Sequence, residues 1–344
     1  MLKESSILEH LRGLGLPLGP SARLSSAGDG NINWVRRVED GGRSWVVKQA
    51  GPTLAKFPEY EADPGRLLHE ARYFEAAAAR DPDGVCPQVI QLDAANHLLV
   101  LEDLGDALRF DVALAEGHDL RPAVERIATF LGRVHAGSFE HAELAAFPDG
   151  EAGEGVLGLH LAHIFTLPFE PNDFPLSDAL SEAAQALQAD AAFGARLAEV
   201  FAACRRRGPV LVHGDVQPTN VLIPESGARL LDPEMAHAGA AAFDLGLFFA
   251  HLAIDGIARN DLAGAAAIID AGWQAYRAAG GDAVGCRFAD VAAVAGVETL
   301  RRTLGAARVP AVEADPVGLA CVRAGRAWVM SPPDAPSGLV ALAR

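Results

Sequence analysis

Residues 211–223 read LVHGDVQPTNVLI, a segment in which polar side chains interrupt two short apolar runs. Short apolar runs bounded by turn-forming residues are typical of strands, so we predict a strand, a loop and a second strand here. A hydrophobic core gains nothing from buried polar groups unless each finds a partner. The loop residues His213, Asp215, Gln217 and Asn220 are therefore expected to carry chemistry at the tip of a strand-loop-strand unit.

A second acidic segment follows this loop. Asp232 closes the apolar run RLL, 17 residues after Asp215, and a hairpin return of the chain would bring the two carboxylates together. Taken singly, each such Asp or Asn would be a turn former. Together they match phosphoryl transfer, which needs a carboxylate to position or deprotonate an acceptor hydroxyl, and oxygen ligands for Mg²⁺. Asp215 suits the first task, and the hard oxygen atoms of Asn220 and Asp232 suit Mg²⁺.

The surrounding sequence predicts an α+β fold with two lobes. A small β-rich lobe is expected over residues 1–102 and a larger, mainly α-helical lobe over residues 103–344. Turn signals and helical periodicity define the expected elements of both lobes. In the first lobe they are a helix at 4–14, strands within 22–50, a helix from 63 to 80, and strands at 87–92 and 97–102. In the second lobe they are helices at 121–135, 179–207, 242–257, 261–279, 287–306 and 316–330.

Composition restricts the class of protein further. The formal net charge of −16 argues against a nucleic-acid binder, which would normally carry a basic face. No uninterrupted apolar run reaches the roughly 20 residues of a membrane-spanning helix, and the N-terminus carries Glu4 and Glu9 where a signal peptide would be basic. Four scattered cysteines without a CxxC pair predict reduced thiols. We therefore expect a cytoplasmic protein, monomeric or homodimeric, whose partner is a small molecule with a hydroxyl group.

The segments HGDVQPTNVL and LLDPEMAHAGAAAFDLG together resemble the aminoglycoside phosphotransferase and choline kinase superfamily, which has a protein-kinase-like fold. The resemblance implies ATP and Mg²⁺ as cofactors, Asp215 as catalytic base, and Asn220 and Asp232 as Mg²⁺ ligands. His213 would be a structural part of the catalytic loop. Asp244 matches an acid that braces this loop from the following helix; from the residues alone it could equally be an Asp in the first turn of that helix.

The expected first lobe contains a candidate phosphate-binding lysine. The chain has only three lysines against 26 arginines, and Lys48 closes the strand SWVVK, the position that contacts the α- and β-phosphates in kinase-like folds. The alternative is an ordinary surface lysine. A helix carboxylate should hold this ammonium group, and Glu70 and Glu75 flank the apolar stripe of their helix about equally. Periodicity therefore leaves both open, while the family pattern selects Glu70.

Two more segments are expected to contact the nucleotide. The loop SAGDGNIN contains Gly28, Asp29, Gly30 and Asn31, and small residues there would let backbone N–H groups approach the phosphates. It is not a GxGxxG motif, and its two glycines alone are a weak signal. The segment VLEDLG fits the adenine-binding hinge, where backbone groups of Glu102, Asp103 and Leu104 would form the hydrogen bonds.

A narrower resemblance extends over nearly the whole chain. The segments GDGNINWVRRV, VVKQAGP and ETLRRTLGAARV are similar to those of the 5-methylthioribose kinase family. This similarity implies that Asp232 and Glu234 form a metal-binding pair and that Arg301 and Arg302 bind substrate. From the residues alone, the two arginines would be read as a salt-bridged helix surface.

The sequence also departs from that family. The family's catalytic loop usually reads like HGDLHTGS, whereas this chain has HGDVQPTN, and KFPEYEADPGR replaces a Trp-Pro segment. The most favoured function is therefore a kinase for a methylthioribose-like sugar, with an aminoglycoside or amino-alcohol kinase as the alternative. A catalytically idle nucleotide-binding module is disfavoured because the expected base, metal ligands and lysine are all present. A metallohydrolase using His213, Asp215, Asp232 and His237 is disfavoured because zinc sites of that kind favour several histidines at fixed spacing.

Overall fold

The predicted strands of residues 22–50 form one antiparallel ribbon in the computed structural model. They are β1 (Arg23–Ser26), β2 (Trp34–Asp40) and β3 (Arg43–Gln49). Gly41 and Gly42 join β2 to β3, with φ angles of 58° and 82°. Two consecutive positive φ angles are typical of the two-residue hairpin turn that glycine favours. The turn predicted from DGG is thus confirmed.

The structure describes most of the chain, with short gaps. The described residues are 2–27, 32–56, 59–137, 141–148, 150 and 155–342. Of the sequence predictions, the phosphate loop residues Gly28, Asp29, Gly30 and Asn31 lie outside this described part.

Strands β4 (Val89–Asp93) and β5 (Leu98–Glu102) complete a five-stranded antiparallel sheet in the order β1-β2-β3-β5-β4. Side chains alternate between the two faces of a strand. On β3, Val47 therefore packs into one hydrophobic cluster, while Val46 packs against another on the opposite face. Lys48 shares the face of Val46, so the strand period itself directs the lysine away from the cluster that contains Val47.

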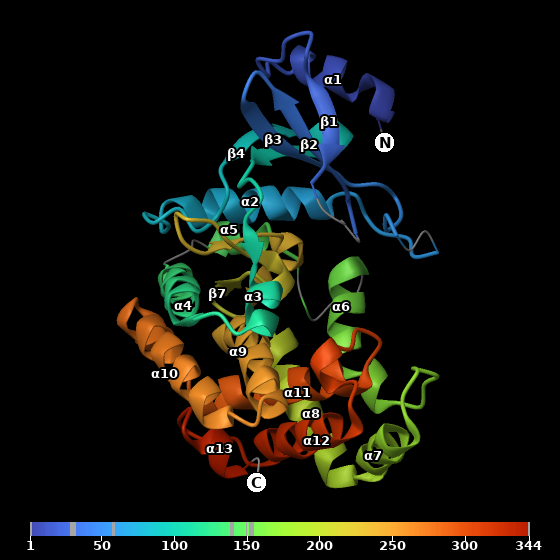
Figure 1. The fold of residues 1–344 in the computed structure, drawn as a ribbon, viewed down its shortest axis with the longest axis vertical. Helices are drawn as coiled ribbons and strands as arrows, with labels where there is room; N and C mark the ends of the chain where they lie inside the picture. Colours follow the sequence, from blue (N-terminus) through green and yellow to red (C-terminus); the bar gives the residue numbers. More distant parts are fainter. Residues whose placement is uncertain are drawn as a thin grey trace.

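Two helices cover the two faces of this sheet. Helix α1 (Glu4–Gly13) contributes Ile7 and Leu11 to the cluster that contains Val47. Helix α2 (Arg66–Ala78) packs on the opposite face and crosses between the sheet and the helical part of the molecule (Figure 1). It is contacted from below by the 3₁₀ turn η4 (Pro233–Met235). Helix α2 therefore connects the sheet to the segment that carries Asp232.

The rest of the chain is mainly helical, as predicted (Figure 1). Helices α9 and α11 pack side by side at its centre, α12 packs against α11, and α10 packs against α4 and α9. The described helices here are α3 (Phe110–Glu116), α4 (Arg121–His135), α5 (His141–Ala145), α6 (Gly155–Phe165), α7 (Asp178–Ala189), α8 (Ala191–Arg205), α9 (Ala241–Ala258), α10 (Leu262–Ala278), α11 (Phe288–Leu304), α12 (Asp315–Met330) and α13 (Gly338–Leu342). The α+β class is confirmed, while the division after residue 102 stays a prediction.

The segment predicted to be helical over 179–207 is helical, and the chain divides it into α7 and α8. Asp190 lies between them with φ −82° and ψ 94°, outside the helical region. Its carboxylate accepts hydrogen bonds from the backbone N–H groups of Ala192 and Phe193 at 3.1 and 3.0 Å. Such N-capping stabilises the first turn of α8, and it explains why an Ala-rich stretch stops and restarts.

Five short strands hold the polar loop that was singled out in the sequence. β7 (Val210–Val212) pairs with β10 (His237–Gly239). β8 (Val221–Ile223) pairs with β6 (Leu108–Arg109) on one side and with β9 (Arg229–Leu230) on the other. The β8–β9 hairpin is the predicted return of the chain. Beyond it, the N–H of Leu231 donates to the carbonyl of Asn220 at 2.8 Å, so Asn220 and Asp232 leave the hairpin as neighbours.

Helix α9 is the most apolar element of the interior. In the part of the chain that the structure describes, it alone has the length and apolar character of a membrane-spanning helix, and 83% of it is buried inside the fold. Burial of this kind is typical of a central core helix, which packs on all sides. A cytoplasmic location stays a prediction.

Candidate active site

The polar loop leaves β7 at Val212, and its backbone is shaped by one glycine. Gly214 has a φ of +84°, a left-handed conformation that side chains other than glycine rarely adopt. A Cβ atom at this position would lie 2.1 Å from the carbonyl oxygen of Met235. Glycine is therefore required for two independent reasons, and the loop packs closely against η4 because of it.

Asp244 holds this loop from the first turn of α9. Its Oδ2 accepts the backbone N–H of His213 at 2.7 Å and its Oδ1 accepts that of Gly214 at 2.8 Å. The ring of His135 lies 3.1 Å from Oδ2. Burial raises the pKa of Asp244, but His135, His213 and the Gly214 N–H together outweigh it and hold the pKa below its usual value. The arrangement is the one that the predicted bracing role requires.

His213 lies behind the loop and does not face solvent. Its Nε2 lies 2.9 Å from the carbonyl oxygen of Leu231, the residue before Asp232. Burial lowers the pKa of this imidazole, so it is neutral and donates that hydrogen bond. The ring of His237 is turned to the carbonyl of Met235 at 2.9 Å. Within the described ranges, no group of three or more His, Cys, Asp or Glu side chains is arranged so that it could hold a metal ion.

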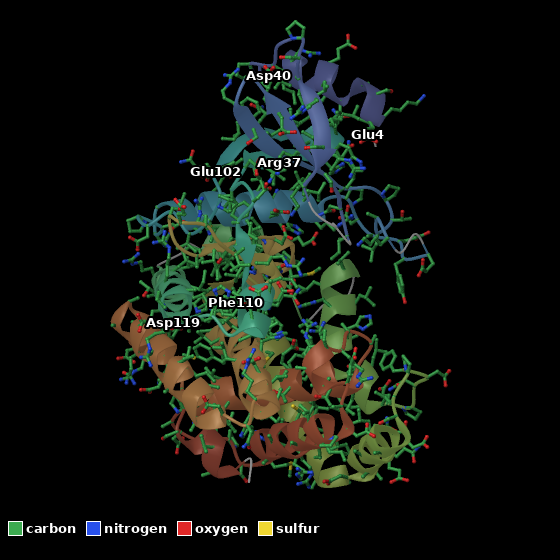
Figure 2. All side chains as sticks on the ribbon, viewed as in Figure 1. Glu4, Arg37, Asp40, Glu102, Phe110 and Asp119 are labelled. Atoms are coloured by element: carbon green, nitrogen blue, oxygen red, sulfur yellow. The ribbon has the colours of Figure 1, made fainter. Side chains whose placement is uncertain are left out.

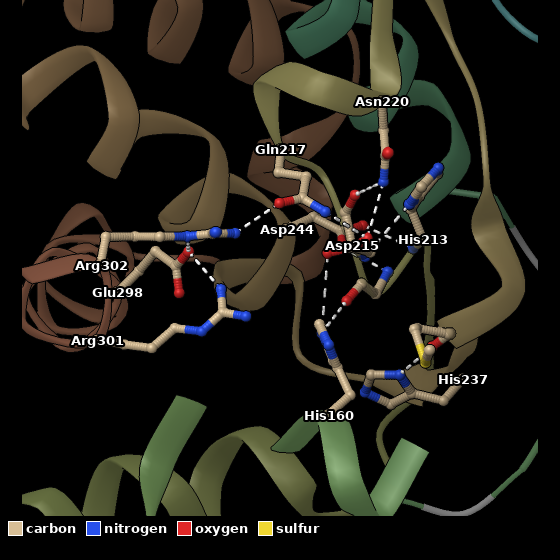
Figure 3. A network of polar contacts seen from close by, with 12 residues as sticks. His160, His213, Asp215, Gln217, Asn220, His237, Asp244, Glu298, Arg301 and Arg302 are labelled. Carbon is tan, nitrogen blue, oxygen red and sulfur yellow. Dashed lines mark hydrogen bonds and ion pairs between the residues drawn. The ribbon is translucent and has the colours of Figure 1, made fainter. Parts of the chain in front are cut away.

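Asp215 projects from the tip of the loop, and its side chain is 18% exposed. Its Oδ2 accepts hydrogen bonds from Nε2 of Gln217 and Nδ2 of Asn220, both at 2.8 Å. The Asn220 amide nitrogen also lies 3.0 Å from the Asp215 carbonyl, which leaves the amide oxygen of Asn220 directed elsewhere. Oδ1 of Asp215 takes part in neither of the two bonds to Oδ2, and it lies on the side of His160 (Figure 3).

His160 of α6 is a neighbour of this carboxylate that sequence reasoning missed. Its Nε2 lies 3.0 Å from the carbonyl oxygen of Gly214 and 4.0 Å from Oδ1 of Asp215. Burial lowers the pKa of His160 to about 4, so the ring is neutral and donates to the Gly214 carbonyl. In the sequence this residue is one histidine in an apolar helix, and nothing distinguishes it from a histidine of the core.

Lys48 reaches the same region from β3. Its Nζ donates to both carboxylate oxygens of Glu70, at 2.8 and 2.9 Å, and is also paired with Asp232. Glu70 is fully buried on α2 whereas Glu75 is exposed, so the structure pairs the lysine with the residue that the family pattern selects. Burial lowers the pKa of Lys48, but Asp232, Glu70 and Glu234 outweigh it and raise the pKa, so the ammonium group stays charged.

Glu234 lies two residues beyond Asp232, within η4, and contacts Asn33 next to the sheet. Its Oε2 accepts a hydrogen bond from Nδ2 of Asn33 at 2.9 Å and lies 3.8 Å from Nε of Arg66. Burial raises the pKa of Glu234 to about 7, against the opposite effects of Lys48 and Arg66. Asp232 itself has a φ of 63°, a left-handed conformation that Asp tolerates better than most residues, and it turns the chain into η4.

These side chains open on a cleft of about 550 Å³ between the sheet and the helical part. One wall is apolar and comes from the sheet, with Val35, Val46 and Leu101; the other contains Leu222 and Leu231. Eight of the residues singled out in the sequence line this cleft. They are Lys48, Glu102, Asp103, Leu104, Asp215, Asn220, Asp232 and Glu234.

The predicted hinge lies at the rim of this cleft, where Arg37 and Glu102 face the helical part (Figure 2). Asp103 is paired with Nε of Arg37 at 2.7 Å, and the Glu102 carboxylate with Nη2 of Arg229 at 2.7 Å. The N–H of Glu102 donates to the carbonyl of Gln88 at 2.9 Å, so it is not available to a ligand. The hinge is thus held by side-chain ion pairs that the sequence pattern did not predict.

Arg301 and Arg302 lie on α11, and both are buried. Glu298 shares their helix face, as the spacing i, i+3, i+4 requires, and its Oε1 accepts from Nη1 of Arg301 at 2.8 Å and Nε of Arg302 at 2.6 Å. Burial raises the pKa of Glu298, but the two guanidinium groups outweigh it and lower the pKa well below its usual value. The arginines are therefore salt-bridged, as one alternative expected, but they lie inside the molecule and not on its surface.

Most of the chain matches a known protein family. The model of the phosphotransferase enzyme family matches residues 23–279. A methylthioribose kinase of Exiguobacterium sibiricum is 26% identical over 339 residues, which span 89% of this chain and 85% of that protein.

Solved structures show the same fold at lower identity. A choline/ethanolamine kinase family protein from Mesorhizobium loti superposes with a TM-score of 0.54 at 17% identity, over 98% of this chain and 99% of that chain. The spectinomycin phosphotransferase APH(9)-Ia, in complex with ADP and spectinomycin, gives a TM-score of 0.51 at 12% identity, over 99% of this chain and 98% of that chain.

Proposed function

This chain belongs to the phosphotransferase enzyme family and is a kinase that acts on an alcohol, and from that premise we propose that it transfers the γ-phosphoryl group of ATP to a hydroxyl of 5-methylthioribose or a close sugar analogue. One observation carries the proposal. Asp215, Asn220, Asp232 and the Lys48–Glu70 pair converge on one cleft although they come from distant parts of the chain. The sugar is proposed from the likeness to a methylthioribose kinase, which spans most of both chains.

The cleft has the features that a nucleotide requires. Its apolar walls would sandwich the adenine ring, and free backbone groups at the hinge would bond the ring edge. Lys48 is oriented by Glu70 and faces the polar end of the cleft, where it would contact the non-transferred phosphates. Its present bond to Asp232 would then give way to bonds with phosphate oxygens.

The donor set of the cleft also fits Mg²⁺. Three carboxylates, those of Glu70, Asp232 and Glu234, face two cationic side chains, Lys48 and Arg66, so formal negative charge is in excess. The Asn220 amide oxygen and the Asp232 and Glu234 carboxylates are hard oxygen ligands of the kind that Mg²⁺ selects. Bound there, Mg²⁺ would neutralise charge on the phosphates during transfer.

Asp215 would act on the acceptor alcohol. Oδ1 would accept the hydroxyl proton as the alcohol oxygen bonds to the γ-phosphorus, while the bond between that phosphorus and the β,γ-bridging oxygen breaks and ADP leaves. Gln217 and Asn220 both donate to Oδ2 and would keep Oδ1 aimed at the acceptor. His160, neutral and bonded to the Gly214 carbonyl, would form one wall beside this oxygen.

The charges near Asp215 favour a neutral sugar over a cationic acceptor. The carboxylate of Glu298 is already neutralised by two arginines, so it offers little attraction to an ammonium group. An aminoglycoside or choline would meet Arg301 here, where acidic side chains would be needed to bind a cation. The aminoglycoside and amino-alcohol kinases are therefore the second candidates.

The test is ADP release with Mg²⁺-ATP, measured for 5-methylthioribose, ribose, an aminoglycoside and choline, with the Asp215→Asn variant as the blank. We expect rapid turnover with 5-methylthioribose and background rates with the two cationic compounds. Turnover with choline or the aminoglycoside alone would overturn the assigned substrate class. ATP binding without turnover on any alcohol would favour the idle nucleotide-binding module.

A further inference from the structure

Four side chains link the C-terminal half of α11 to the catalytic loop. Glu298 accepts from Nε of Arg302 at 2.6 Å, Nη2 of Arg302 donates to Oε1 of Gln217 at 2.5 Å, and Nε2 of Gln217 donates to Oδ2 of Asp215 at 2.8 Å. Figure 3 shows the four groups in one continuous row. Residues 85 positions apart in the chain, Gln217 and Arg302, are thus in direct contact.

The hydrogen bonds of this row can form in only one donor-to-acceptor order. A guanidinium group has donors and no acceptor, and an ionised carboxylate has acceptors and no donor. Gln217 lies between the two, so its amide oxygen must face Arg302 and its amide nitrogen must face Asp215. Arg302 therefore determines which end of the Gln217 amide meets the carboxylate.

Arg302 is also fully engaged by the protein. Besides its bonds to Glu298 and Gln217, its Nη1 donates to the carbonyl of Ala307 at 3.2 Å, so all three of its nitrogen atoms have a protein acceptor. Arg301 differs, because among the described residues its guanidinium group has one hydrogen bond, from Nη1 to Glu298. In Figure 3 the guanidinium group of Arg301 extends toward the side of Asp215 that His160 borders.

We propose that Arg302 is a positioning residue for catalysis, which acts through Gln217 on Asp215, and that Arg301 alone of the pair contacts the acceptor. The inference rests on the proposed role of Asp215 as base. The proposal gives different roles to Arg301 and Arg302, both of which the family resemblance assigned to substrate binding. Gln217 becomes the residue that transmits the position of α11 to the reacting carboxylate.

A merely structural role for Arg302 gives different expectations. The ion pair with Glu298 would stabilise α11 whatever Gln217 does, and its loss would lower the amount of folded enzyme. A positioning role predicts a lower kcat in fully folded enzyme, with KM for ATP unchanged, because no nucleotide contact is altered. The two roles therefore separate in a kinetic measurement on folded variants.

The experiment is a double-mutant cycle with Gln217→Ala and Arg302→Lys. Lysine keeps the charge beside Glu298 and lacks the planar fork that reaches two acceptors, so this variant is expected to fold. Each single change should lower kcat about 10- to 100-fold, the effect of one hydrogen bond to a charged group. The double variant should lose no more than about threefold beyond the worse single variant, since both remove the same link. Multiplication of the two losses would overturn the relay.

Two isosteric or near-isosteric changes at Gln217 provide matched controls. Gln217→Glu keeps size and the acceptor for Arg302 but has no donor for Asp215, so kcat should fall at least as far as in Gln217→Ala. Gln217→His offers one ring acceptor and one ring donor, and it should recover activity relative to Gln217→Ala. The exposed Gln274, which bonds only Asp270 on its own helix, should tolerate Ala without a change in kcat. Equal rates for the Glu and His variants would contradict the inference.

A spectroscopic measurement keeps the relay testable if the assigned substrate is wrong. The side-chain amide signal of Gln217 in a ¹⁵N-resolved NMR spectrum is identified by its loss in Gln217→Ala. It should shift in both Arg302→Lys and Asp215→Asn, because each removes one end of its hydrogen bonding. An unmoved signal in Arg302→Lys would refute the relay, whereas absent wild-type turnover on every alcohol would refute only the proposed function.

Discussion

Replacement of Asp244 by Asn is expected to destabilise the protein more than any single isosteric change within the loop that Asp244 braces. The carboxylate is fully buried and receives three contacts, from the N–H groups of His213 and Gly214 and from the ring of His135. An Asn side chain keeps one acceptor oxygen and turns the other into an NH₂ group. The N–H donors of this NH₂ group would face the backbone N–H of Gly214 or of His213, which is also a donor.

The magnitude follows from these three contacts. A hydrogen bond to a charged group contributes about 1.5–3 kcal/mol, and a buried donor left without a partner costs about 1–3 kcal/mol. With the amide oxygen at the Oδ2 position, the contacts to His213 and His135 can survive while the contact to Gly214 is lost and leaves two donors facing each other, so we expect the free energy of unfolding to fall by about 3–5 kcal/mol. Total stability of a domain is about 5–15 kcal/mol, so the variant should fold but with reduced stability. Turnover should fall as well, since the backbone of the catalytic loop loses its anchor.

The pH dependence of this effect has a definite sign. The pKa of Asp244 is lowered in the folded protein, so its stabilisation is present above the unfolded-state pKa of about 3.9 and is lost as the pH falls through the lower folded-state value. The difference between wild type and Asp244→Asn should therefore be constant from about pH 5 to pH 8. It should shrink only below about pH 4.

Urea denaturation followed by circular dichroism measures the effect, with Asp255→Asn as the matched control. Asp255 lies on the same helix but is partly exposed and paired with Arg259 at i, i+4, so its loss should cost no more than about 1 kcal/mol. A loss below about 1 kcal/mol for Asp244→Asn, equal to that of the control, would refute the bracing role.

Three further changes test other parts of the site. Asp215→Asn should lower kcat by about 10²–10⁴-fold and leave the Kd of ATP, measured by calorimetry, nearly unchanged; a wild-type rate would refute its role as base. Asp232→Ala should weaken Mg²⁺-dependent ATP binding at least about tenfold, and an effect confined to KM for the sugar would contradict its metal role. Gly214→Ala should lower the free energy of unfolding by more than about 2 kcal/mol. Two costs add, because the backbone at position 214 is left-handed and the new Cβ would lie 2.1 Å from the carbonyl oxygen of Met235. The control Gly42→Ala has the same kind of φ, +82°, but open space around it, so strain alone should cost it about 1 kcal/mol; equal losses would show that the close approach does not matter.

Structural features that depend on residues close together in the sequence could be predicted. The β2–β3 turn follows from Gly41 and Gly42, and the hairpin that makes Asn220 and Asp232 neighbours follows from two short apolar runs. The helical character of residues 179–207 follows from their Ala-rich composition, and the break at Asp190 has a local cause, because its side chain caps α8.

Contacts between residues that are far apart in the sequence could not be predicted from the sequence. Glu70 and Glu75 border the same apolar stripe, and only the packing of α2 against the sheet buries Glu70 beside Lys48. Asn33 meets Glu234 across 201 positions, and His160 meets the catalytic loop across 54. Neither contact leaves a periodic signal in the chain.

The sequence by itself determined the strand-loop-strand that carries Asp215 and Asn220, the α+β class and the order of the elements, since these depend on turn residues and on apolar periodicity within short windows. Only the tertiary structure decided which carboxylate holds Lys48 and that Arg302 meets Gln217 inside the molecule. The physical reason is that a hydrogen bond between distant segments depends on how helices and sheet pack, and packing is a property of the whole chain.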